Sequence, residues 1–344
     1  MPLSFLPSPS ENGFNIGPLF IHVYGLMYVV GIALAIYITR RRWKAAGGDP
    51  SLVADVATWA VPAGIIGGRI YFDITTPGDI PPHWWGILAV WSGGLGVWGG
   101  IAAGALAGVW RVRRSGASWV VFANAIAPAL LVAQAVGRIG NYFNQELFGK
   151  PSTLPWALEI SPVHRPGGFT QFATFQPTFL YELIWDLVLA AALVWLGHHR
   201  KIRPPGLFAL YVAGYSAFRI FEEFLRIDSS EHFLGLRLNF YVASAGVIAG
   251  LVWFTLTQRR TGPFPEAGPP SSSADIAEAV TEAEAEAEQT GDGEPDSGPA
   301  PAGADGANGA ASATGTVASG AGTSGAGTSG SGPGGPAAGQ ASEE

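Results

Sequence analysis

The feature that most constrains the fold is a series of apolar runs long enough to cross a bilayer. Seven such runs precede residue 260, near 19–39, 52–74, 87–110, 118–139, 178–197, 205–225 and 238–258. A helix needs about 20 predominantly apolar residues to span the hydrocarbon core. In lipid the backbone must satisfy its own hydrogen bonds, so such runs fold as helices. The sequence therefore predicts an all-α polytopic membrane protein with seven transmembrane helices.

Basic residues predict how these helices are oriented. Clusters of Arg and Lys follow the first, third, fifth and seventh runs, at 40–44, 111–114, 200–203 and 259–260. Alternate loops lie on one side of the membrane, and the positive-inside rule makes that side cytoplasmic. We therefore expect the N-terminus outside and the C-terminus in the cytoplasm. Residues 1–17 lack a basic n-region and a small-residue cleavage site, so we expect the first run to be retained as a helix.

The chain changes character after Arg260. All 19 Lys and Arg lie at or before Arg260 together with 13 acidic residues, so this part carries 19 − 13 = +6. The other 13 acidic residues follow among Pro, Gly, Ala, Ser and Thr, which brings the net charge to −7. Such a composition cannot bury enough apolar surface to offset the entropy lost on ordering. We expect a seven-helix domain over residues 1–260 and a disordered cytoplasmic tail over residues 261–344.

The longest predicted external connection, residues 150–177, is rich in Pro, Gly and Thr. We expect it to form a small cap over the outer face of the membrane domain. The chain contains no cysteine, so it offers no disulfide, thiolate metal site or cysteine nucleophile of its own.

Charged side chains gather at the predicted outer ends of the helices. Ionisable groups at such depth are costly, so they are usually paired, functional or both. The set comprises Arg69, Asp73, Arg138, Glu146, Glu182, Asp186, Arg219, Glu222, Glu223 and Arg226, with Tyr24 and His22 at the start of the first run. The spacing favours i,i+4 pairs at 69/73, 219/223 and 222/226. A structural pair between Arg138 and Glu146 is the alternative to a functional site.

The residue types indicate what such a site would bind. Arginine without lysine suits bidentate recognition of phosphate. Asn141, Asn144, Gln145 and Tyr24 supply hydrogen bonds for ester carbonyls or glycerol hydroxyls. At headgroup depth, the ligand that fits is a phospholipid, and an anionic one.

Residues 137–149, with the sequence GRIGNYFNQELFG, also carry a family resemblance. Shorter motifs accompany them at 22–28, 67–70, 93–100, 176–182 and 218–224. In their order and spacing, over about residues 15–258, these motifs resemble bacterial prolipoprotein diacylglyceryl transferases.

The resemblance implies a multi-pass enzyme of the cytoplasmic (inner) membrane whose active site faces the outer leaflet. Such enzymes transfer the diacylglyceryl group of phosphatidylglycerol to the lipobox cysteine of preprolipoprotein signal peptides, the first step of lipoprotein maturation. They form a thioether and release glycerol phosphate. The resemblance implies no metal, no organic cofactor and no nucleic-acid partner. The lack of cysteine is consistent with it, because the reacting thiol belongs to the substrate.

The motif match also assigns residues. It implies a catalytic set of Arg138, Arg219, Glu146, Tyr24 and Asn141, in which the two arginines hold the lipid phosphate. It implies a substrate-binding set of Arg138, Arg219, Gly93, Gly99, Gly149, Glu223 and, as a weaker match, Arg69. Two positions depart from the family, since Trp98 and Gln176 stand where many members carry histidine.

Several alternatives stay open. Glu146 is the leading candidate for the base that deprotonates the thiol, but its role is equally explained by orienting Arg138, and His22 is another candidate. Close helix packing would also explain the glycines of the third run. A transporter would place its charges near the midplane, often with internal repeats. A retinal receptor needs a lysine that residues 239–257 lack. A lipid-binding protein without catalysis remains compatible with the sequence.

Overall fold

The computed structural model describes residues 5–90, 93–227, 232, 233 and 235–268. This part of the chain forms seven α-helices: α1 (Val23–Ala45), α2 (Ser51–Thr75), α3 (Val97–Arg114), α4 (Trp119–Asn144), α5 (Thr178–His199), α6 (Gly206–Leu225) and α7 (Leu238–Gln258). Five of them, all except α3 and α6, are long and apolar enough to cross a membrane. The all-helical class is thus confirmed. The seven spans and their orientation stay predictions.

Two predicted helices begin later than expected. Residues 19–22 form strand β2 (Leu19–His22), which pairs antiparallel with β1 (Gly13–Ile16), and α1 starts only at Val23. The third run begins with the 3-10 turn η2 (Gly86–Leu88) and a loop in which Gly93 has φ +85°, and α3 starts only at Val97. A further 3-10 turn, η1 (Pro77–Asp79), lies in the connection before it. Hydropathy alone cannot distinguish an apolar strand or loop from the first turns of a buried helix.

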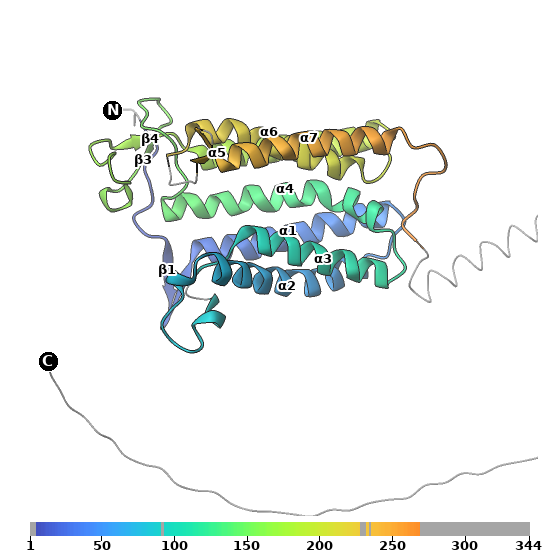
Figure 1. The fold of residues 1–344 in the computed structure, drawn as a ribbon, viewed down its shortest axis with the longest axis horizontal. Helices are drawn as coiled ribbons and strands as arrows, with labels where there is room; N and C mark the ends of the chain where they lie inside the picture. The colour runs from blue at the N-terminus through green and yellow to red at the C-terminus, as the bar shows by residue number, and fades with distance from the viewer. Residues whose placement is uncertain (1–4, 91–92, 228–231, 234, 269–344) are drawn as a thin grey trace, which may run out of the picture. The chain divides into compact units, whose positions relative to one another are not determined.

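The helices lie side by side, with α4 against α1, α5 and α6 (Figure 1). The α2–α3 contact depends on small residues. A Cβ on Gly99 would overlap the carbonyl oxygen of Gly67 and the side chain of Tyr71, and one on Gly100 would lie 3.3 Å from the carbonyl oxygen of Gly64. Because lipid gives helices no hydrophobic reason to associate, close backbone approach of this kind holds them together. The packing explanation for these glycines therefore has direct structural support.

The loops after the odd-numbered helices lie at one end of the bundle (Figure 1). A hydrophobic cluster at this end includes Trp43 and Phe122, and the loop after α5 joins the end of α7, where the Arg203 amide donates to Oε1 of Gln258 at 2.9 Å. The segment 261–268, which the sequence assigns to the tail, lies against this end. The carbonyl oxygen of Ala267 accepts a hydrogen bond from the Ser118 amide at 2.8 Å, and Ala267 is buried in the cluster. Arg203 lies over the Phe264 ring at 4.7 Å. The remainder of the predicted tail, 269–344, lies outside the described residues.

The opposite end carries the cap, here residues 148–177. Its strands β3 (Leu158–Glu159) and β4 (Thr174–Phe175) pair antiparallel, with the turn η4 (Pro162–His164) between them. The buried side chains of Phe148, Ile160 and Phe175 form its core with Phe179 of α5. The N-terminal segment joins this core, since Leu6 forms a parallel bridge with Leu158. Nearby, β5 (His232–Phe233) and β6 (Leu236–Arg237) form a short hairpin before α7.

Candidate functional site

Three helices bring two arginines together at the cap end. Glu182 of α5 is completely buried. Arg138 of α4 donates from Nη2 to its Oε1, and Arg219 of α6 has Nη1 3.6 Å from its Oε2. The hydroxyl of Tyr215 donates to Oε1 at 3.0 Å. Two guanidinium groups that meet one carboxylate lie within reach of a single anion of phosphate size.

A second group of carboxylates holds Arg219 from its own helix. Nη1 of Arg219 pairs with Oε2 of Glu222, and Nη2 lies 2.9 Å from Oε1 of Glu223, the predicted i,i+4 partner. The other oxygen of Glu223 lies 2.6 Å from Nε of Arg237, at the start of α7. The two glutamates are buried, whereas the side chains of Arg138 and Arg219 keep 17 % and 18 % of their surface exposed. The arginines are therefore the accessible face of a buried ionic network.

Glu146 lies just beyond the C-terminal end of α4. Its Oε1 accepts hydrogen bonds from Nδ2 of Asn141 at 2.8 Å and from Nδ2 of Asn144 at 3.2 Å. Asn141 also receives a long hydrogen bond, 3.4 Å, from Nη1 of Arg138. Arg138 thus pairs with Glu182, and Asn141 links it to Glu146. The alternative of a direct Arg138–Glu146 pair is wrong, because α5 supplies the closer carboxylate.

Tyr24 connects α1 to the same region. Its ring lies against Gly140, where any Cβ would overlap it, and its hydroxyl is 3.0 Å from that of Tyr28. Tyr24 therefore packs against α4 at Gly140, the residue that precedes Asn141 in the chain. His22 ends β2, is exposed, and has its ring 4.8 Å from the ring of Phe20.

The guanidinium of Arg69 is bound by groups of the protein itself. Its guanidinium donates to the carbonyl oxygens of Gly86, Ile87 and Gly93 at 2.6, 3.0 and 2.7 Å. Its Nε also lies 3.1 Å from Asp73, the predicted i,i+4 partner, and the side chain is only 5 % exposed. These contacts favour a structural role for Arg69 that holds the loop before α3. Its assignment to substrate binding stays a prediction.

The three predicted site glycines lie at close backbone contacts. The carbonyl of Gly93 binds Arg69, and Gly99 lies at the α2–α3 crossing. Gly149 donates to the carbonyl of Gln176 at 2.8 Å, and a Cβ there would come within 2.8 Å of the Leu225 carbonyl oxygen. Gly99 and Gly149 permit an approach of two segments that a side chain would prevent. A Cβ on Gly93 would meet open space, and what favours glycine there is the positive φ of +85°.

Sequence reasoning missed two members of the ionic network, Tyr215 and Arg237. It named a third, Glu182, without assigning it a partner. Tyr215 lies four residues before Arg219, so helical spacing would have placed both on one face. Trp98 and Gln176, the two positions where many family members carry histidine, form none of the ion pairs of this network. Trp98 is 51 % exposed on α3, and Oε1 of Gln176 accepts a hydrogen bond from Tyr181 at 2.6 Å.

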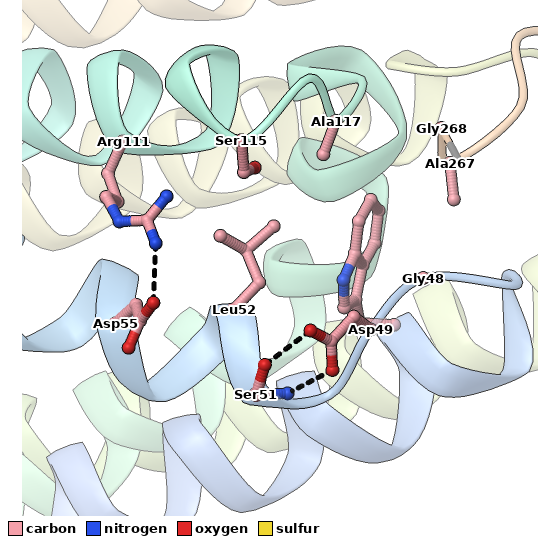
Figure 2. Close-up of a pocket in the computed structure, with 11 residues that line it drawn as sticks. Gly48, Asp49, Ser51, Leu52, Asp55, Arg111, Ser115, Ala117, Ala267 and Gly268 are labelled. Atoms are coloured by element: carbon pink, nitrogen blue, oxygen red, sulfur yellow. Dashed lines mark hydrogen bonds and ion pairs between the residues drawn. The ribbon is translucent and has the colours of Figure 1, made fainter. Parts of the chain in front are cut away.

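A pocket of about 230 Å³ lies at the end of the bundle opposite the cap, between the α1–α2 loop, α3 and residues 267–268. Figure 2 shows the residues that line it. Its charges are paired locally. Arg111 lies 2.5 Å from Asp55, and Asp49 accepts hydrogen bonds from the amide and hydroxyl of Ser51. The candidate site therefore lies with the arginines and not with this pocket. Within the described ranges no group of three or more His, Asp or Glu side chains is arranged to hold a metal ion.

Comparison with known proteins gives a consistent assignment. Residues 12–256 match the family model described as prolipoprotein diacylglyceryl transferase. Curated proteins called phosphatidylglycerol–prolipoprotein diacylglyceryl transferase are similar over most of their length. One from Streptomyces coelicolor is 46 % identical over 246 residues, 70 % of this chain and 76 % of its own. One from Cutibacterium acnes is 45 % identical over 264 residues, 75 % and 88 % of the two chains. One from Frankia alni is 44 % identical over 268 residues, 76 % and 70 % of the two chains. The chain belongs to the prolipoprotein diacylglyceryl transferase family.

Proposed function

We propose that this protein transfers the diacylglyceryl group of phosphatidylglycerol to the lipobox cysteine of preprolipoproteins, the first step of lipoprotein maturation. The observation that carries the proposal is the convergence of Arg138 and Arg219 on Glu182 at one end of an apolar helical bundle. An anionic headgroup at that depth would meet both guanidinium groups. The names of the relatives supply the two substrates.

In the proposed reaction the cysteine sulfur attacks the terminal glycerol carbon of the diacylglyceryl group. The bond between that carbon and the phosphate oxygen breaks, a carbon–sulfur bond forms, and glycerol phosphate leaves with the bonding electrons. Negative charge grows on the leaving phosphate, where Arg138 and Arg219 can stabilise it. Removing one such preorganised donor typically costs about 3 kcal/mol of transition-state stabilisation. Each guanidinium has five N–H donors, so the contacts to Glu182 and Asn141 leave Arg138 with others for the phosphate.

The thiol must lose its proton for this attack, since a free thiol with a pKa of about 8.5 is mostly protonated near neutral pH. Trp98, at the position of a histidine in many members, has no basic nitrogen for this purpose. We assign Glu146 as the base that accepts the thiol proton. Asn141 and Asn144 both donate to its Oε1, so the assignment uses Oε2 as the acceptor oxygen. Asn141 then couples the base to Arg138 on the phosphate. Tyr24, beside Asn141, is assigned a hydrogen bond to the lipid.

The proposal places the cap end of the bundle at the outer leaflet of the cytoplasmic membrane. The support for this orientation is the distribution of basic residues. The clusters at 40–44, 111–114, 200–203 and 259–260 lie at the end opposite the cap. By the positive-inside rule that end is cytoplasmic, and all seven helices cross the bilayer.

The direct test incubates the purified full chain with phosphatidylglycerol vesicles and a synthetic lipobox peptide, followed by mass spectrometry of the peptide. We expect the peptide mass to rise by one diacylglyceryl unit. The matched control peptide has Ser in place of the lipobox Cys and should gain nothing. A second control replaces phosphatidylglycerol with a zwitterionic phospholipid. An unmodified Cys peptide in the presence of phosphatidylglycerol would refute the proposed function.

A further inference from the structure

Gln145 follows the last residue of α4 in a left-handed conformation, with φ 51° and ψ 47°. Helices commonly end with such a residue, but it is usually glycine, because a Cβ makes the conformation costly. Leu147, two residues later, also has a positive φ of 55°. A non-glycine residue persists in such a conformation only where its surroundings hold it there. The chain therefore retains the Gln145 side chain despite a backbone cost that glycine would avoid.

The Gln145 side chain is buried, with 4 % exposure, and its amide connects two distant segments. Nε2 donates to the carbonyl oxygen of Pro9 at 2.8 Å, in the N-terminal segment. Oε1 accepts a hydrogen bond from the amide of Ser161 at 2.8 Å, in the cap. Both functions of the amide group are thus used, and each partner is a backbone group. Only a carboxamide of this length satisfies a donor and an acceptor at once in this place.

Further hydrogen bonds hold the same N-terminal segment. The Leu6 amide donates to Ala157 at 2.7 Å, and the Leu6 carbonyl accepts from the Glu159 amide at 2.8 Å. The hydroxyl of Tyr142, in the last turn of α4, donates to the carbonyl of Pro7 at 2.8 Å. Residues 6–9 therefore link the end of α4 to the cap, with Gln145 at the junction.

Glu146 is the next residue in the chain, and its orientation depends on this junction. The peptide plane after Gln145 carries the Glu146 backbone, so a change in the backbone angles of Gln145 would rotate Glu146 away from Asn141 and Asn144. Those two amides contact one oxygen of the carboxylate, at 2.8 and 3.2 Å. They restrict the carboxylate. The backbone of residue 146 is held by one hydrogen bond of its own, from the Glu146 amide to the Asn141 carbonyl at 3.2 Å, which depends on the same left-handed turn at Gln145.

We propose that Gln145 is a positioning residue for Glu146, and that the N-terminal segment 6–9 is part of the active-site scaffold. The Gln145 amide fastens this segment to the cap, fixes its own left-handed backbone, and so aims the Glu146 carboxylate at the substrate thiol. The proposal rests on the role assigned to Glu146 under the proposed function.

The test compares Gln145→Met with the parent chain in the transfer assay, with rates expressed per folded protein. Methionine keeps the volume and removes both hydrogen bonds. A misplaced catalytic group typically loses about 10- to 100-fold in rate, so we expect kcat to fall by that factor. We expect KM for phosphatidylglycerol to stay unchanged, because the arginines that contact the phosphate are not affected. Gln145→Gly removes the clamp but relieves the backbone strain, and we expect the same loss.

Thr174→Val is the matched control. It removes a hydrogen bond within the cap, from Oγ1 of Thr174 to the Ser152 carbonyl at 2.7 Å, without touching the junction. We expect parent kcat from this variant. Hydrogen exchange at the Ser161 amide gives a readout besides activity, and we expect faster exchange in Gln145→Met but not in Thr174→Val.

A double variant separates positioning from general destabilisation. If Gln145 acts through Glu146, Gln145→Met should add no further loss of kcat to Glu146→Gln. If the double variant loses kcat by the product of the two single losses, the positioning role is overturned. It is also overturned if Gln145→Met or Gln145→Gly keeps the kcat of the parent chain. The proposed function would be refuted instead if the parent chain transfers nothing while Gln145→Met still speeds hydrogen exchange at the Ser161 amide.

Discussion

Arg219 has two roles in the structure, and one pair of substitutions separates them. The arginine contacts the carboxylates of Glu182, Glu222 and Glu223, whose side chains are 0, 1 and 2 % exposed. Arg219→Ala leaves these three buried carboxylates with one cation fewer. Removing one partner of a buried ion pair typically costs about 3–5 kcal/mol of unfolding free energy. A domain holds in total about 5–15 kcal/mol, so the single substitution is expected to destabilise the protein as well as inactivate it.

The compensated variant Arg219→Gln with Glu222→Gln removes one charge of each sign. We expect it to recover most of the unfolding free energy that Arg219→Ala loses, measured by thermal unfolding in detergent. Transfer should remain low, because the leaving phosphate still lacks one cationic partner. Loss of one such donor lowers kcat by about 10²- to 10³-fold. The assay is kcat per folded protein with phosphatidylglycerol vesicles and the lipobox peptide.

Two controls accompany this comparison. Glu222→Gln alone keeps Arg219 and should retain most of the activity. Arg111→Gln removes an arginine that pairs with Asp55 at the opposite end of the bundle, and it should transfer at the parent rate. Parent kcat in the compensated variant would show that Arg219 serves only the ionic network, and the phosphate-clamp reasoning would fail.

Three further outcomes follow from the fold. Gly99→Val should disrupt the α2–α3 crossing and lower the unfolding free energy by about 1–3 kcal/mol or more, measured by thermal unfolding, since its Cβ meets the α2 backbone. Truncation after Arg260 should cost about 1–2 kcal/mol through the lost hydrogen bond and burial at 261–268, whereas truncation after Gly268 should leave the unfolding temperature unchanged. Because the chain has no cysteine, single-site labelling can test the orientation. A membrane-impermeant maleimide added to intact cells should modify Val163→Cys and spare Ala46→Cys, and the reverse pattern would contradict the proposed topology.

The sequence alone determined the helical class, the approximate helix positions and the ends of the helices at which the charged residues gather. These are local properties, because mean hydropathy over about 20 residues reports whether a segment can enter lipid, whatever its neighbours are. The motif around Arg138 likewise identified the family before any contact was known. Local hydropathy also explains the errors, since apolar residues 19–22 form a strand and residues 87–96 precede the third helix.

Only the tertiary structure decided which groups meet. Arg138 of α4 pairs with Glu182 of α5 rather than with Glu146 eight residues ahead, and Gln145 binds the carbonyl of Pro9, 136 residues earlier in the chain. Such pairings depend on the rotation and depth of each helix, which side-chain packing sets across the whole bundle. For the same reason the sequence placed Arg69 near the outer end of the second run, but only packing revealed that its guanidinium donates to backbone carbonyls.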